Sequence, residues 1–138
     1  MTSQVEGPAV PGSLVAVVDD DESVRESLPD LLREWGLAVQ GFSSAEDFLA
    51  SGAVNETGCL ILDVAMPGMS GRELHQELLR RRLAIPVVFI TGQLDEGMRP
   101  RLLAEGAVEC LFKPLRETAL LEAVQIALGR IALGRRDA

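Results

Sequence analysis

The chain has 138 residues, 47% of them hydrophobic, and a formal net charge of −8 at pH 7. This length is typical of one domain with a single core, and the acidic balance argues against direct binding of nucleic acid, which normally needs a basic face. No apolar run reaches the roughly 18 residues of a membrane helix, and the N-terminus lacks the pattern of a signal peptide. We therefore expect a cytoplasmic protein with no membrane partner.

Short apolar runs alternate with helical patterns along the whole chain. Continuous apolar runs of this length are typical of strands buried on both faces of a sheet. The expected strands are Leu14–Val18, Leu37–Phe42, Cys59–Leu62, Ile85–Thr91 and Val108–Phe112.

Capping residues mark where several helices begin. Ser23, with Glu26 three residues later, forms a capping-box pattern and predicts a helix that ends at Gly36. Ser70 and Glu73 repeat the pattern ahead of the third helix.

The remaining helices follow from apolar spacing. They are expected from Ser44 to Gly52, Gly71 to Arg82, about Met98 to Gly106, and Glu117 to about Leu133. Pro29 should bend the first helix, and Leu74, Leu78 and Leu79 should form the inner face of the third. The inner stripe expected for the last helix is Leu120, Leu121, Val124, Leu128 and Ile131.

Strict alternation of strands and helices predicts an α/β fold, a doubly wound five-stranded parallel sheet with helices on both faces. The predicted divisions are a flexible N-terminal extension over residues 1–13, the domain over 14–133 and a C-terminal tail over 134–138. Cys59 and Cys110 lie within apolar runs, so we expect them to be small core residues without a disulfide. His75 is expected to be a solvated helix residue rather than a phosphodonor or metal ligand.

Polar side chains stand where the apolar runs end. Asp19 and Asp20 follow the first run and Asp63 the third, while Thr91 ends the fourth and Lys113 follows the fifth. Ligands bind at the carboxyl ends of strands in open α/β sheets. Carboxylates held together invite a hard divalent cation, and Mg²⁺ is well suited. A phosphate reaching this pocket would need the metal, a lysine and a hydroxyl to offset its charge.

The chain resembles the response regulator receiver domain, the CheY-like module of two-component signalling. The resemblance rests on four stretches between residues 14 and 114, namely Val17–Asp21 with Arg25 downstream, Leu62–Gly71, Pro86–Gly92, and Gly106-Ala107 leading to Lys113-Pro114.

The resemblance implies specific roles for the clustered residues. Asp63 would accept a phosphoryl group from a phosphohistidine of a histidine kinase or phosphotransfer protein. Mg²⁺ would be held by Asp19, Asp20, Asp63 and the backbone carbonyl of Ala65. Thr91 would bind a phosphoryl oxygen and Lys113 would pair with the phosphate. The family also implies the sheet order 2-1-3-4-5 and a Lys113-Pro114 bond that is often cis.

One position departs from the family. Receivers usually carry Tyr or Phe three residues before the lysine, where the ring couples to the threonine, whereas this chain has Cys110. A small buried thiol cannot swing between two pockets as a ring does. Our hypothesis is that output passes through backbone movement of the loop 92–97.

The leading functional prediction is a phosphorylation-controlled switch that changes the binding of a downstream protein, catalyses only its own phosphoryl transfer and dephosphorylation, and can form a homodimer through the fourth and fifth helices. Two alternatives to this prediction stay open.

A phosphatase using Asp63 as nucleophile would characteristically carry a second Asp two residues later, where this chain has Ala65. A degenerate receiver acting as a constitutive adaptor would not need all five site residues. A flavodoxin-like protein is disfavoured because no Gly-rich phosphate loop follows the first strand.

Overall fold

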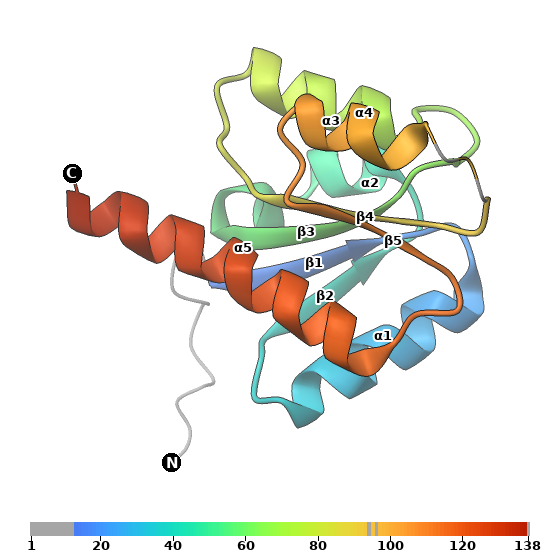
Figure 1. Ribbon diagram of the computed structural model, residues 1–138, viewed down its shortest axis with the longest axis horizontal. Coiled ribbons are helices and arrows are strands. Elements are labelled where there is room, and N and C mark those ends of the chain that lie inside the picture. The colour runs from blue at the N-terminus through green and yellow to red at the C-terminus, as the bar shows by residue number, and fades with distance from the viewer. Residues whose placement is uncertain (1–12, 94, 96, 138) are drawn as a thin grey trace.

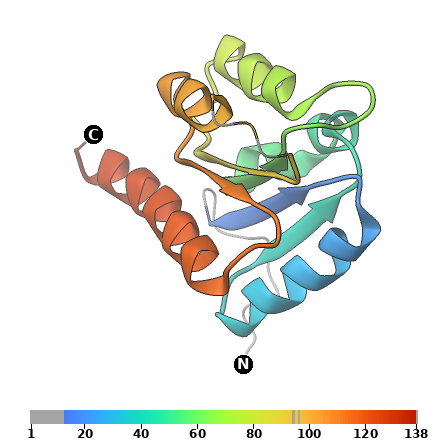
Figure 2. The ribbon, with the colours of Figure 1, turned by 45° about the vertical axis from the view of Figure 1, so that its right-hand side comes forward.

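A five-stranded parallel sheet separates two layers of helices (Figures 1 and 2). The computed structural model describes residues 13–93, 95 and 97–137. The strands lie in the order β2-β1-β3-β4-β5, and every neighbouring pair is parallel. The predicted fold class and strand order are therefore confirmed. The strands are β1 (Leu14–Val18), β2 (Val39–Phe42), β3 (Thr57–Asp63), β4 (Val87–Thr91) and β5 (Glu109–Phe112).

The helices cover both faces of this sheet. They are α1 (Glu22–Glu34), α2 (Ala45–Ala50), the 3₁₀ helix η2 (Gly52–Glu56), α3 (Gly71–Arg80), α4 (Met98–Ala104) and α5 (Glu117–Asp137). Figures 1 and 2 show α1 and α5 on one side of the sheet, and α2, α3 and α4 on the other.

Alternate residues of each central strand enter opposite cores. In β3, Leu60 and Leu62 pack toward α2, α3 and α4, whereas Cys59 and Ile61 pack toward α1 and α5. Because side chains alternate across a sheet with a period of two, both sets must be apolar when both faces are covered. This requirement explains the unbroken apolar runs, and it leaves the strand ends as the only polar positions of β3.

The start of α1 differs from the prediction. Asp21, not Ser23, caps the helix, and its carboxylate accepts from the Ser23 backbone N–H at 2.9 Å and from the Ser23 hydroxyl at 2.8 Å. Aspartate and serine are equally favourable as N-caps. The helix begins after Asp21, the earlier of the two residues. At α3 the predicted capping box is confirmed, because Ser70 and Glu73 exchange both hydrogen bonds.

Other boundaries shift by a few residues. β2 and β4 each begin two residues later than expected, and the short helix η2 was not predicted. The last helix continues past Leu133 to Asp137, because Gly134 does not interrupt it. The predicted extension over 1–13 lies, except for Ser13, outside the described residues.

The buried face of α3 is centred differently from the prediction. Leu74 and Leu78 are fully buried as expected, but Leu79 is 51% exposed. Its expected place is taken by His75, one turn earlier, which is only 3% exposed and packs edge-on against Phe89 of β4. The expectation that His75 is solvated is therefore wrong. The imidazole is planar and small, so it packs in the core against Phe89 despite its polar nitrogens.

Burial gives His75 a pH-dependent role in stability. Its Nδ1 has no hydrogen-bond partner, and burial lowers the pKa of the imidazole below 6.5, although the nearby Glu105 carboxylate opposes this shift. Because the folded-state pKa is the lower one, the unfolded chain binds the proton more tightly, and the contribution of His75 to stability must fall as pH drops below about 6.5. We expect His75→Leu to weaken this acid destabilisation, as measured by urea denaturation at about pH 7.5 and about pH 5.5.

Gln76→Leu is the matched control, because Gln76 is the exposed neighbour of His75 on the same helix. This variant should keep the pH dependence of the wild type. Equal pH dependence in the His75→Leu variant and the wild type would contradict the prediction. At neutral pH the His75→Leu variant should lie within about 1 kcal/mol of the wild type, because the loss of the ring contact offsets the removal of an unpaired polar atom.

Both cysteines belong to the core. Cys59 and Cys110 are buried and free, as the apolar runs around them predicted. Among the described residues, no helix is both long and apolar enough to cross a bilayer.

Candidate functional site

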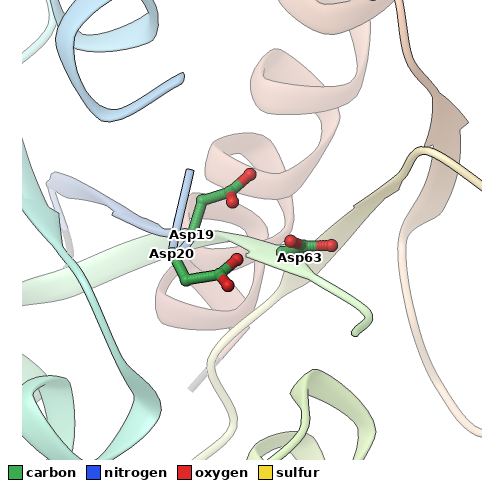
Figure 3. A group of neighbouring side chains, drawn as sticks. All are labelled: Asp19, Asp20 and Asp63. Carbon is green, nitrogen blue, oxygen red and sulfur yellow. The ribbon is translucent and has the colours of Figure 1, made fainter. Parts of the chain in front are cut away.

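Two neighbouring strands bring the acidic residues together. β1 pairs with β3 so that Val18 lies beside Leu62, and the next residue in each strand direction is Asp19 or Asp63. Figure 3 shows the carboxylates of Asp19, Asp20 and Asp63 gathered at these two strand ends. One carboxylate oxygen from each of them lies within 4.8 Å of the others. The sequence prediction of an acidic cluster at this edge is confirmed.

Asp19 is the fully buried member of the cluster. Its Oδ1 accepts from the Asp21 backbone N–H at 2.9 Å, and its Oδ2 accepts from Lys113 Nζ at 3.0 Å. The Asp19 backbone carbonyl accepts from the Arg25 guanidinium at 2.9 Å. Both side-chain oxygens and the main chain are thus held, so the Asp19 carboxylate has a fixed orientation.

Asp63 is less completely satisfied. Its Oδ1 accepts from the Ala65 backbone N–H at 3.3 Å, and its Oδ2 lies 3.9 Å from Lys113 Nζ. Burial, and then the negative charge of Asp19, raise the pKa of Asp63 to about 7, although Lys113 and the Ala65 N–H oppose the shift. Loss of solvation disfavours the charged carboxylate first, and the neighbouring like charge adds to this effect.

The donor set fits a hard divalent cation. Three carboxylates face a single ammonium group, and Asp20 is exposed while Asp19 and Asp63 are buried. An all-oxygen set with one open side suits Mg²⁺, which binds through a few carboxylates and keeps several waters. A dication here would offset the repulsion that raises the pKa of Asp63.

Thr91 and Lys113 come from the next two strands. Thr91 ends β4, is 1% exposed, and its hydroxyl oxygen accepts from the Gln93 backbone N–H at 3.1 Å. The Lys113 backbone N–H donates to the Thr91 carbonyl at 2.8 Å, which fixes where the lysine leaves β5. The Lys113-Pro114 peptide bond is cis, in line with the family pattern. The structure thus brings Lys113 into contact with Asp19 and Asp63. It places Thr91 at the end of β4, which lies between β3 and β5.

Two supporting residues were not found from the sequence. A Cβ on Gly71 would lie 2.1 Å from the Asp63 carbonyl oxygen, so the start of α3 can approach the site only without a side chain. Glu46 of α2 accepts from the Met69 backbone N–H at 3.0 Å and so ties down the loop after Asp63. The glycine directly after the Ser70 cap was a usable signal, because glycine is a poor helix former and its presence there points to a close approach of backbone. Nothing in the sequence marks Glu46.

The comparisons with known proteins agree with this geometry. Residues 15–125 match the family model of the response regulator receiver domain. The chain is 46% identical over 118 residues to Nodulation protein W of Bradyrhizobium diazoefficiens, covering 86% of this chain and 52% of that protein. It is 44% identical over 130 residues to the transcriptional regulatory protein FixJ of Azorhizobium caulinodans, covering 93% and 62% respectively.

Solved structures give the same answer. The crystal structure of FixJ-N superposes with a TM-score of 0.77 at 40% identity, covering 84% of this chain and 93% of that one. The response regulator StyR superposes with a TM-score of 0.83 at 46% identity, covering 90% and 63%.

The matched region contains every residue of the site described above, from Asp19 to Lys113. The chain spans about half to three fifths of the length of the curated relatives it matches. The fold, the acidic edge of the sheet and these matches lead to one conclusion: the chain belongs to the response regulator receiver domain family.

Proposed function

We propose that this receiver is a phosphorylation-controlled switch whose phosphoacceptor is Asp63. The observation that carries the proposal is the position of Asp63, buried at the end of β3 beside Asp19 and within 3.9 Å of the Lys113 ammonium. Asp63 is not the cap of the following helix, because Ser70 takes that role. Costly buried carboxylates of this kind are typical of functional sites.

The phosphoryl donor is a phosphohistidine on a histidine kinase or phosphotransfer protein. A carboxylate oxygen of Asp63 attacks phosphorus, a P–O bond forms, and the P–N bond to the donor imidazole breaks. The electron pair of that bond stays on the imidazole nitrogen. The attacking oxygen must be ionised, so the nearby Lys113 ammonium, which favours the charged form, supports the step.

Asp19, Asp20, Asp63 and the Ala65 backbone carbonyl would hold Mg²⁺. The bound ion would supply positive charge that offsets the developing charge on the transferring group. Lys113 is already at the site, oriented by its hydrogen bond to Asp19, and would pair with the phosphoryl group once it arrives. The Thr91 hydroxyl would bind a phosphoryl oxygen, at the cost of its bond to the Gln93 N–H.

Output is proposed to pass through backbone movement rather than through a ring flip. Cys110 stands where the family usually has an aromatic residue, and it is 2% exposed within the core beneath α4. We infer that phosphorylation moves the backbone of the loop 92–97, of which 94 and 96 lie outside the described residues. Changed binding of a downstream protein, or pairing of two copies through α4 and α5, would be the readout. The cytoplasm is the proposed setting, consistent with two free buried cysteines.

Intact-protein mass spectrometry tests the proposal directly. The wild type is incubated with acetyl phosphate, with Mg²⁺ in one arm and a chelator in the other. We expect one added phosphoryl group only in the Mg²⁺ arm, and none in Asp63→Asn. Asp30→Asn is the matched control, because Asp30 is an exposed aspartate on α1 outside the cluster, and it should be phosphorylated like the wild type.

The alternatives predict different results. A constitutive adaptor would gain no mass with donor and metal present. A phosphatase would release phosphate continuously from unrelated monoesters, which the Ala65 position disfavours because no second carboxylate stands there. Amide exchange of the loop 92–97 in the same phosphorylated sample tests the output hypothesis, and unchanged exchange would contradict it.

A further inference from the structure

A groove opens on the α4 side of the phosphoacceptor loop. It has a volume of about 620 Å³ and lies between the loop that joins β3 to α3 and the helix α4. Its apolar lining includes the buried Met66 and Leu102 and the more exposed Pro67 and Met98. This volume falls in the usual range of ligand-sized pockets, so one or two apolar side chains of a partner can fill it.

Among the described residues, the rim of the groove carries a net positive charge, from Arg72 and Arg101 with Glu105 beside them. Arg101 is exposed on α4, lines the groove, and makes no ion pair among the described residues. The neighbouring arginine on the rim, Arg72, is instead neutralised by Glu105 through a two-point contact, with Nε 2.9 Å from Oε1. Arg101 helps to lower the pKa of Glu105, but the Glu105 carboxylate is already held by Arg72. Arg101 is therefore the rim arginine whose guanidinium can pair with an incoming carboxylate.

The net charge of the whole chain strengthens the preference of this groove for an acidic partner. With a net charge of −8, the protein repels an acidic segment over most of its surface, including the exposed Glu22, Glu26 and Asp30 on α1. An arginine without an ion pair beside an apolar groove then attracts such a segment, and complementary charge selects partners and steers their approach. Two methionines in the lining add tolerance to the shape of the occupant, because the thioether chain adapts easily.

We propose that this groove docks an acidic–apolar segment of a partner protein. One apolar residue of the segment enters the pocket against Met66, Met98 and Leu102, and an adjacent Asp or Glu pairs with Arg101. The wall formed by Val64 and Ala65 belongs to the loop that follows Asp63, and the Ala65 N–H donates to the Asp63 carboxylate. Docking and the state of Asp63 therefore act on one segment of backbone, and each must alter the other by the same factor. This last link, but not the docking, rests on the proposed function.

Methionine methyl NMR on the full chain is the experiment. The chain has four methionines, and Met66 and Met98 are the two that line the groove. The probes are short synthetic peptides that alternate Asp or Glu with Leu or Phe, and matched peptides with Lys in place of each acid. We expect acidic peptides to shift Met66 and Met98 in a saturable way, and the lysine peptides to leave them unshifted.

Reversing the charge of Arg101 tests whether this arginine pairs with the acidic peptides. Arg101→Glu should weaken binding of the acidic peptides about tenfold and improve binding of the lysine peptides. Arg116→Glu, which makes the same charge change at an exposed arginine outside the groove, should bind as the wild type does. Equal affinity for Arg101→Glu and wild type, or no shift with acidic peptides, would overturn the proposal. So would a concentration-dependent dimer that Arg101→Glu abolishes, because the occupant would then be a second copy.

The two proposals can fail separately. Peptide binding is measured on unphosphorylated protein and needs no phosphoryl transfer, so a chain that takes no phosphoryl group can still bind the acidic peptides. Conversely, a chain that is phosphorylated normally and shows no shift at Met66 and Met98 disproves only the groove.

Discussion

Replacing Gly71 with alanine should destabilise the protein by about 3 kcal/mol or more. The added Cβ would lie 2.1 Å from the Asp63 carbonyl oxygen and 3.1 Å from the Val64 Cα. Both are backbone atoms, so no side chain can rotate away, and either the end of β3 or the start of α3 has to move. The shift would also break the bond from the Gly71 N–H to the Val64 carbonyl, 3.0 Å in the structure. Urea denaturation measures the loss.

Gly129→Ala is the matched control and should have the opposite sign. Gly129 lies within α5, and a Cβ there meets nothing within 4 Å. Alanine in a helix interior is favoured over glycine by about 1 kcal/mol, so this variant should be slightly more stable than the wild type. If Gly71→Ala is as stable as the wild type, the close approach of α3 to Asp63 is not a constraint on the fold.

The fold could be predicted because burial on both sides of the sheet leaves an unambiguous pattern. Strands such as Cys59–Leu62 must be apolar throughout when helices cover both faces. The same logic located the site, since a carboxylate such as Asp63 directly after a buried run can only stand at the edge of the sheet. Asp19 and Lys113 met across the sheet as expected, at 3.0 Å.

The pattern could not predict features that depend on tertiary packing. His75 reads as polar, and only the contact with Phe89 shows that its ring belongs to the core. Asp21 and Ser23 are both good caps, so the choice between them depends on how the chain leaves β1. Glu46 reaches the loop after Asp63 from a position 23 residues earlier, and no local spacing encodes such a contact.

The Lys113→Met variant should show how much the Lys113 ammonium stabilises the negative charges of the acidic cluster. Methionine keeps much of the length of the side chain and removes its charge. Asp19 is fully buried and would lose its ion pair, while Asp63 would lose the Lys113 ammonium, which lowers its pKa. Breaking one partner of a buried pair leaves a charge without compensation, so in the presence of a chelator we expect a loss of about 2 to 3 kcal/mol in the free energy of unfolding.

Mg²⁺ should reverse most of that loss. Without the Lys113 ammonium, three carboxylates attract the dication more strongly, so its affinity should rise by about tenfold relative to the wild type, and binding to the folded state alone stabilises it. Denaturation curves at increasing Mg²⁺ measure both quantities, with Arg116→Met as the control for removal of a cation outside the cluster. Phosphorylation should still fail in the Lys113→Met variant, because the metal replaces the charge of the lysine in the resting site but not its contact with the phosphoryl group. If the variant is as stable as the wild type in chelator, the ion pair with Lys113 is not needed to keep the Asp19 carboxylate buried, and the prediction is wrong.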